Sequence, residues 1–352
     1  MSRNMKDANQ SFFNHIINSI PAEYSDFNIP NCVRYIKTNE IEKAWLKNAV
    51  ITRSFKFSKN SFAVLIYFEE AEYICLINAT QQLKQPVENF ELIEINSGVF
   101  TLLGSEGFLK INAGIDSSEI IDKLLYDTSQ LNGEYTGHEL YDIEQYFYKL
   151  LLFKLNFNFP ECYIKDNANL FYWVICNLLV QMRILSSNAY NAKTIEAWER
   201  IIFEQSELDR FNYKGLLLSY CALTWDITYL YLYQCLEDIF VKSAATSLYK
   251  KLKIEMPISN FSHLLYDELQ WQPKDLDCIQ SIVDKLDQTS EALVNIKLVS
   301  KDMDIAKWIY KMRNSIVHET RETLIAIDDD EQWNNAITGL IYLLIEATTT
   351  IN

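Results

Sequence analysis

Apolar residues in the first third of the chain occur in short runs that are rich in β-branched and aromatic residues. Polar or turn-forming residues such as Ser58, Lys59 and Asn60 separate these runs. Because such spacers are too short for crossover helices, the runs favour an antiparallel meander. The predicted strands cover residues 51–57, 62–68, 73–77, 90–95, 99–103 and 108–111. We expect a short helix before them and helices at 117–128 and 139–155 after them.

From residue 168 onward, the apolar positions repeat at the spacing of amphipathic helices. Helices are predicted at 170–185, 193–205, 215–252 and 276–297. The next helix begins after Asp304 as its cap, and its buried stripe consists of Ile305, Trp308, Ile309, Met312 and Ile316. An acidic run at 328–331 precedes a last helix, whose inward residues are Trp333, Ile337, Leu340, Ile341 and Leu344.

These patterns predict an α+β chain, with a strand-rich antiparallel N-terminal domain followed by an all-α helical bundle. We expect the first domain over residues 1–155, where it would act as a sensor or regulatory module. A helical connector is expected over 156–205 and the bundle over 206–352. A length of 352 residues agrees with such a division into domains.

Composition narrows the classes of function. Lys and Arg total 32 and Asp and Glu total 47, so the formal net charge is −15. This balance argues against a protein that coats nucleic acid by bulk charge, although it leaves room for a local basic site. The seven Cys form no CxxC pair, which is typical of reduced thiols in a cytosolic protein.

The sequence also bears on where the protein acts. The N-terminal residues lack the apolar core of a signal peptide. Acidic residues such as Asp226 and Glu237 interrupt the apolar stretch at 216–240, which favours a buried bundle helix over a membrane span. We therefore expect a cytoplasmic protein without a membrane partner.

Motifs for metal or cofactor chemistry are missing from the sequence. The four His, at positions 15, 138, 263 and 318, do not have metal-ligand spacing. The chain contains no P-loop, no GxGxxG and no GxSxG motif. The acidic run at 328–331 could bind Mg²⁺, but helix capping explains it better. We expect neither a metal nor a cofactor.

One predicted helix carries polar residues outside its buried stripe. At 100° per residue, Arg313, Asn314 and His318 all fall off that stripe. Arg313 and His318 are about 140° apart on an ideal helix, so they do not share one face. They could converge through a distortion near Val317, through the reach of the Arg313 side chain, or across a second subunit.

The sequence Arg313-Asn314-x-x-x-His318 resembles the signature of the HEPN superfamily, the higher eukaryotes and prokaryotes nucleotide-binding domain. That signature is Arg-x4–6-His, with a polar residue, often Asn, directly after the Arg. The resemblance covers roughly residues 206–352 and does not explain residues 1–205. It implies a small helical bundle and a homodimer in which two motifs form one composite site. It also implies a metal-independent endoribonuclease of the kind found in toxin–antitoxin, CRISPR and anti-phage abortive systems, with RNA as substrate and a regulatory protein or antitoxin as a possible partner.

The chemistry of RNA cleavage agrees with that implication. The 2′-hydroxyl is an internal nucleophile, so the reaction needs a base for it and an acid for the leaving 5′-oxygen. Imidazole titrates near neutral pH, so His318 suits both tasks, while Arg313 would hold the phosphate. Asn314 would orient either group. Glu237 resembles the acidic residue that often supports the family motif from a neighbouring helix. Local positive charge for RNA binding would come from Lys307, Lys311 and Arg321.

Other interpretations of these residues remain open. His318 could be a helix-end residue favoured by the helix dipole, Glu237 an ordinary surface acid, and the lysines a solvated face. The rival function is a non-catalytic HEPN-like scaffold module that dimerises or binds a nucleotide or a partner protein. In a further variant, nucleotidylation of a Tyr two residues after the His silences a toxin. Here Thr320 occupies that position, which disfavours this variant.

Overall fold

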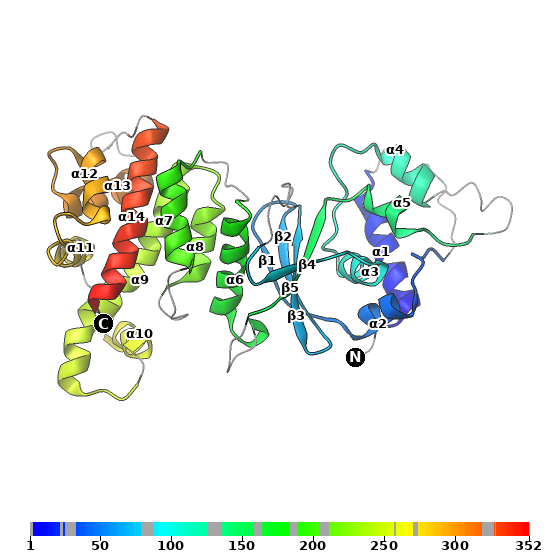
Figure 1. The fold of residues 1–352 in the computed structure, drawn as a ribbon, viewed down its shortest axis with the longest axis horizontal. Helices are drawn as coiled ribbons and strands as arrows, with labels where there is room; N and C mark the ends of the chain where they lie inside the picture. The colour runs from blue at the N-terminus through cyan, green and yellow to red at the C-terminus, as the bar shows by residue number, and fades with distance from the viewer. Residues whose placement is uncertain are drawn as a thin grey trace. The chain divides into compact units, whose positions relative to one another are not determined.

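The chain forms two compact units, Met1–Asn167 and Ala168–Asn352. The structure is a computed structural model that describes residues 3–21, 24, 33–78, 87–125, 135–157, 164–183, 189–203, 211–256, 258–269, 274–318, 327 and 329–351. The first unit contains an antiparallel sheet and the second is helical, as Figure 1 shows, so the predicted α+β class is confirmed. The observed division between units follows residue 167, whereas the sequence suggested a division after 155 and a separate connector at 156–205.

The sheet of the first unit has five strands: β1 (Val50–Lys56), β2 (Phe62–Phe68), β3 (Ala71–Ile77), β4 (Phe90–Ile93) and β5 (Leu150–Leu155). Their order is β1-β2-β3-β5-β4, and all neighbours are antiparallel. The first three strands form the predicted meander. Glu69 and Glu70 connect β2 to β3 with positive φ at both positions, the backbone of a tight hairpin turn.

The helices of the first unit are α1 (Met5–Ser19), α2 (Glu40–Asn48), α3 (Ser97–Ser105), α4 (Ser117–Ile120) and α5 (Leu140–Glu144). A π-helical turn (Ile121–Leu125) follows α4, and the 3-10 turn Ile164–Asp166 ends the unit. The strand prediction for 99–103 is wrong, because these residues lie in α3. The side chain of Asn96 caps that helix by accepting the amide of Val99.

Two further predictions for this unit are also wrong. The helix expected over 139–155 ends at Glu144, and residues 150–155 form β5, the strand inserted between β3 and β4. Residues 108–111 form no strand and contribute only an isolated bridge between Ile111 and Phe147.

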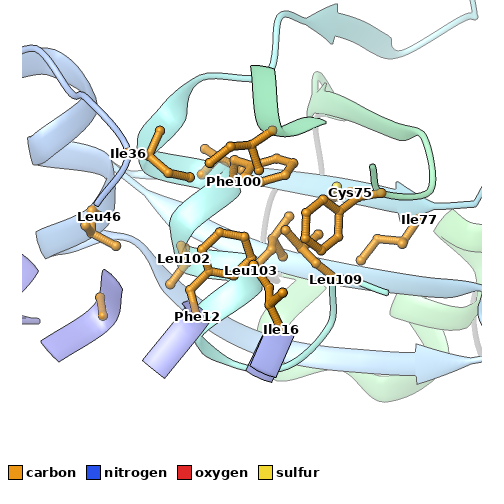
Figure 2. Packing of buried hydrophobic residues seen from close by; sticks show 14 of the residues in the cluster. Phe12, Ile16, Ile36, Leu46, Cys75, Ile77, Phe100, Leu102, Leu103 and Leu109 are labelled. Atoms are coloured by element: carbon orange, nitrogen blue, oxygen red, sulfur yellow. The ribbon is translucent and has the colours of Figure 1, made fainter. Parts of the chain in front are cut away.

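The core of the first unit lies where α1 and α3 meet the sheet, as Figure 2 shows. Phe12 and Ile16 of α1, Phe100 of α3 and Cys75 and Ile77 of β3 all contribute to it. The rings of Phe12 and Phe100 meet edge to face, with centroids 5.8 Å apart. The large aromatic residues therefore pack the two helices onto the strands.

The second unit consists of nine described helices. They are α6 (Ala168–Gln181), α7 (Ala192–Phe203), α8 (Tyr213–Tyr220), α9 (Trp225–Leu252), α10 (Ile258–Leu269), α11 (Asp275–Val283), α12 (Glu291–Ser300), α13 (Ile305–His318) and α14 (Asp330–Ile351). The helix expected over 215–252 is divided into α8 and α9, and the one over 276–297 into α11 and α12. The last helix, α14, packs against α7, α9 and α12 (Figure 1). Within the described ranges, no helix combines the length and the apolar character that a membrane crossing requires.

Candidate functional site

Helix α13 carries the Arg313-Asn314-x-x-x-His318 motif and is fixed by its cap and its buried stripe. The Asp304 carboxylate accepts the amide of Lys307 at 3.0 Å, so the predicted cap is present. Four residues of the predicted stripe are buried: Ile305, Trp308, Ile309 and Met312. Ile316 is only half-buried, and Ser315 is buried beside it. Burial of the apolar face therefore fixes the orientation of α13, the helix that carries the motif.

A buried tyrosine of α9 connects that helix to α13. The Tyr229 hydroxyl donates to the carbonyl oxygen of Ile309 at 3.0 Å, and its ring meets Trp308 edge to face. In a regular α-helix the same carbonyl accepts the amide of Arg313, four residues later. The hydrogen bond from Tyr229 therefore helps to fix the position of this turn of α13, including the Arg313 backbone, relative to α9.

The Arg313 guanidinium has neighbours on two helices. Its Nη1 donates to Oδ1 of Asn314 at 3.0 Å on α13. On α9, its Nη2 lies 4.0 Å from Oε1 of Glu237, and its central carbon lies 5.8 Å from the Tyr233 ring centroid. The Arg313 side chain remains 30% exposed. The group is thus oriented by protein contacts and still accessible to a ligand.

Behind this group, Tyr233 connects α9 to the start of α11. Its hydroxyl donates to Oδ2 of Asp275 at 3.3 Å, and its side chain is buried. Burial raises the pKa of Tyr233, and the nearby carboxylates of Asp275 and Glu237 raise it further. The phenol therefore stays neutral and acts as a hydrogen-bond donor at physiological pH.

Glu237 has an unusual electrostatic environment. Burial raises the pKa of its carboxyl group, and the negative charges of Asp275 and Asp238 act in the same direction. Arg313 lowers the pKa, but less than these effects raise it. Perturbed carboxyl groups beside an arginine in a partly open position are common at functional sites.

His318 is the last residue of α13 and is exposed. At 100° per residue, it falls within about 60° of Lys307, Lys311 and Asn314 on the helix surface, whereas Arg313 is about 140° away. Because α13 is helical up to His318, a distortion near Val317 does not bring the two groups together. Asn314 lies one turn before His318 and also binds the guanidinium, so it lies between them.

The structure brings some of the predicted site residues together and leaves others apart. The structure brings Arg313, Asn314 and Glu237 together. Lys307 and Lys311 lie on the same side of α13 as His318; Lys307 is exposed and Lys311 is half-buried. Arg321 lies outside the described residues. Sequence reasoning missed Tyr233 and Asp275 as neighbours of the motif. For Tyr233 a signal existed, because Tyr229, Tyr233 and Glu237 follow one another at four-residue spacing along one face of α9.

Among the described residues, no group of three His, Cys, Asp or Glu could hold a metal ion. Asp329 caps α14 by accepting the amide of Gln332 at 2.7 Å, while Asp328 lies outside the described residues. The described cysteines are free thiols: Cys75, Cys176, Cys221, Cys235 and Cys278.

Comparison of the chain with protein-family models, with curated proteins and with solved structures gives no match. Any functional interpretation of the site therefore depends on its residues and their geometry.

Proposed function

We propose that the chain is a metal-independent endoribonuclease of the HEPN type. The observation that carries the proposal is the arrangement on α13, where Asn314 binds the Arg313 guanidinium one turn before an exposed His318. A histidine enclosed by aliphatic side chains would have been incompatible with a polynucleotide substrate. His318 is instead open to solvent.

The proposed reaction is an internal transfer at one phosphodiester. The 2′-oxygen forms a bond to phosphorus and loses its proton to a base, while the bond from phosphorus to the 5′-oxygen breaks and that oxygen gains a proton. The products are a 2′,3′-cyclic phosphate and a 5′-hydroxyl. The imidazole of His318 supplies the base or the acid, and in a dimer two copies would supply both.

Arg313 contributes charge to the proposed reaction. Its planar guanidinium can donate two parallel hydrogen bonds to the phosphate and stabilise the added negative charge of the pentavalent state. Asn314 orients the guanidinium toward the His318 face. Glu237 is a positioning residue in this scheme, because it contacts Arg313 and not the histidine.

The exposed face of α13 supports binding of the substrate backbone. Lys307 and Lys311 are four residues apart and lie on the same side as His318, so a phosphate chain along this face would meet positive charge before the histidine. Arg321 is a further candidate from the sequence. We assign the first unit a sensor or regulatory role, with a regulatory protein or antitoxin as its partner and the cytoplasm as the place of action. A defence or toxin role is part of this proposal by family analogy.

The direct test is incubation of the purified chain with structured and unstructured RNA in EDTA. We expect cleavage products whose 5′ ends accept phosphate from polynucleotide kinase without prior dephosphorylation, because they carry 5′-hydroxyls. His318→Ala and Arg313→Ala should each reduce cleavage by about a hundredfold or more. His15→Ala on the exposed surface of α1 and Arg183→Ala in the turn that follows α6 are matched controls that should cleave like the wild type.

The alternative is a non-catalytic module that dimerises or binds a nucleotide or a partner protein. One observation favours it: His318 ends α13, where a histidine side chain can interact favourably with the last carbonyl groups of the helix without any substrate. Under this alternative, RNA stays intact with the wild type and with both motif variants. His318→Ala would then lower thermal stability instead of activity.

A further inference from the structure

A groove of about 1220 Å³ lies in the first unit, apart from the motif on α13. Its walls come from the end of β4 with the segment that leads into α3, from the first turn of α2, from α5, and from the start of β5. All of these segments are described residues of one compact unit. The groove is therefore a feature of the first unit alone.

One wall of the groove includes residues of β4, an edge strand of the sheet that the described residues form. β4 is the last strand in the sheet order, and its partner is β5. Along β4, the peptide groups of successive residues point alternately toward β5 and away from it. The amide of Asn156 donates to the carbonyl of Asn89, so the peptide groups of residues 89, 91 and 93 point toward β5. Those of Phe90, Leu92 and Glu94 therefore point outward.

Part of this outer edge is free within the described part of the chain. The outward amide of Phe90 already donates to the carbonyl of Val87 at 3.1 Å. Leu92 and Glu94 have no strand beside them among the described residues, and the Leu92 side chain is 52% exposed. A strand edge with free peptide groups is a template for an added extended segment.

The charges around the groove are mostly negative. Four carboxylates, from Glu42, Glu94, Glu139 and Glu144, line it together with one ammonium group, from Lys37. The Lys37 ammonium lies 2.6 Å from Glu139, so these two charges compensate each other.

The remaining carboxylates differ in what they already bind. Glu42 accepts the amide of Asn39 in the capping box of α2. Glu94 and Glu144 are both exposed, and neither forms an ion pair within the described ranges. Their charge favours a cationic partner and opposes a phosphate-bearing one.

The groove also presents apolar surface next to these acids. Leu92 and Tyr141 are 52% and 68% exposed and lie on β4 and α5, two walls of the groove. Exposed Leu and Tyr side chains rimmed by charges are typical of surfaces that bind protein segments.

We propose that this groove binds an extended polypeptide segment in which Lys or Arg alternates with apolar residues. The segment lies along the outer edge of β4 and forms hydrogen bonds with the peptide groups of Leu92 and Glu94. Leu92 and Glu94 are two residues apart, so their side chains point to the same face of the sheet. One side of the segment therefore carries cations over Leu92 to Glu94, and the other side places apolar residues beside Ile93 and Ile95, which also line the groove. This binding function is independent of any ribonuclease activity.

The test uses the full chain and a fluorescein-labelled peptide that alternates lysine with valine, with binding followed by fluorescence anisotropy. We expect saturable binding. A peptide with glutamate in place of lysine should not bind, because its charges repel those of Glu94 and Glu144. A lysine peptide in which prolines replace the central valines should lose affinity by about tenfold or more, because proline has no amide hydrogen to donate.

Variants of the chain separate the groove from general electrostatic attraction. The double charge reversal Glu94→Lys and Glu144→Lys should weaken binding of the lysine peptide about tenfold or more. Its matched control is Glu255→Lys with Glu268→Lys, which changes two exposed acids of the second unit and the net charge by the same amount. Leu92→Ser tests the apolar contact and should also weaken binding.

Two results would overturn the proposal. One is equal loss of affinity in both double variants, which would show attraction to the acidic chain as a whole. The other is equal affinity for the lysine–valine peptide and for its version with prolines, which would exclude addition to the strand edge. Retention of the circular dichroism spectrum in each variant shows that the comparison is made between folded proteins.

Discussion

At the scale of single residues, the Arg313 guanidinium is held without being neutralised. Its contact with Glu237 is long, 4.0 Å, and both side chains are about one third exposed, so this pair contributes little stability. The pKa of Glu237 is raised, so its carboxyl also gives up its proton less readily than an ordinary Glu. The 3.0 Å bond to Asn314 orients the guanidinium but carries no opposite charge. Arg313 therefore keeps positive charge available for an anionic ligand.

The raised pKa of Glu237 predicts a pH-dependent effect on stability. In the folded chain this carboxyl binds a proton at higher pH than in the unfolded chain, where the pKa is about 4.3. The charged form thus costs stability at neutral pH, and the cost disappears as the pH falls through the folded pKa toward 4.3. Glu237→Gln should therefore increase stability at pH 7, by no more than about 1 kcal/mol because the side chain is partly exposed, and the gain should shrink on acidification.

Urea unfolding at several pH values between 4 and 7 measures this trend through tryptophan fluorescence, which reports mainly on the second unit. Glu268→Gln, at an exposed position of α10, is the matched control. If both variants show the same trend with pH, the effect does not come from the environment of Glu237.

The buried hydroxyl of Tyr229 supports a second prediction at this scale. Tyr229→Phe removes its hydrogen bond to Ile309, so the second unit should lose about 1 kcal/mol of unfolding free energy, with 2 as an upper bound. Tyr231→Phe on the same helix, at a half-buried position, should change stability by less than about 0.5 kcal/mol. Guanidinium unfolding curves measure both, and an equal loss in the two variants would contradict the role assigned to Tyr229.

The sequence was informative about the motif and less so about its surroundings. Arg313, Asn314 and His318 could be placed outside the stripe of α13 because helical periodicity depends only on local spacing. Glu237 was suggested only through the family resemblance, although it lies beside Arg313. Asp275 could not be found this way, because its position depends on how α11 packs against α9, a contact between residues 42 positions apart.

At the scale of elements, the secondary-structure prediction was wrong for apolar runs that are buried on all sides. Residues 97–104 of α3 are all buried, so their sequence shows neither the alternation of a strand nor the stripe of a surface helix. The helix expected over 139–155 was wrong for a related reason. β5 is an inner strand of the sheet whose middle residues are buried on both faces, and only residues 145–149 separate it from α5. By contrast, the half-exposed helix α13 was predicted well.

Close packing of α3 against α2 leads to a prediction about Gly98. A Cβ atom at this position would overlap with the carbonyl oxygen of Glu42 and lie 3.0 Å from Cβ of Trp45. Gly98→Ala should therefore destabilise the first unit by about 1 to 3 kcal/mol, although alanine favours helices by about 1 kcal/mol. Hydrogen exchange followed by mass spectrometry should show faster exchange in α2 and α3.

The control for this variant is Gly114→Ala, where the nearest atom to an added Cβ is Oδ1 of Asn112 at 3.9 Å. Exchange in α2 and α3 should then match the wild type. Unchanged protection in the Gly98 variant would mean that the two helices can separate at little cost.

At the scale of the whole molecule, the charge distribution restricts how RNA could be bound. The chain carries a net charge of −15, so an RNA backbone is repelled by most of its surface and attracted only where basic residues gather. Lys307 and Lys311 form such a place on α13. The acidic groove beside β4 has the opposite preference. The two proposed binding surfaces therefore differ in charge, and we expect them to favour partners of different chemistry.

The regular geometry of α13 finally predicts a dimer as the active form. Arg313 and His318 of one helix are about 140° apart, so one chain does not readily present both to the same phosphate. A second copy related by two-fold symmetry could add its own histidine to the same site. Light scattering should give twice the 41.2 kDa of one chain, and the specific activity should fall on dilution as dimers dissociate. His318→Ala should keep the dimer mass while losing cleavage, because the proposed mechanism assigns the exposed imidazole to chemistry and not to assembly. A monomer whose specific activity is constant over dilution would refute the composite site, since one chain would then suffice for cleavage.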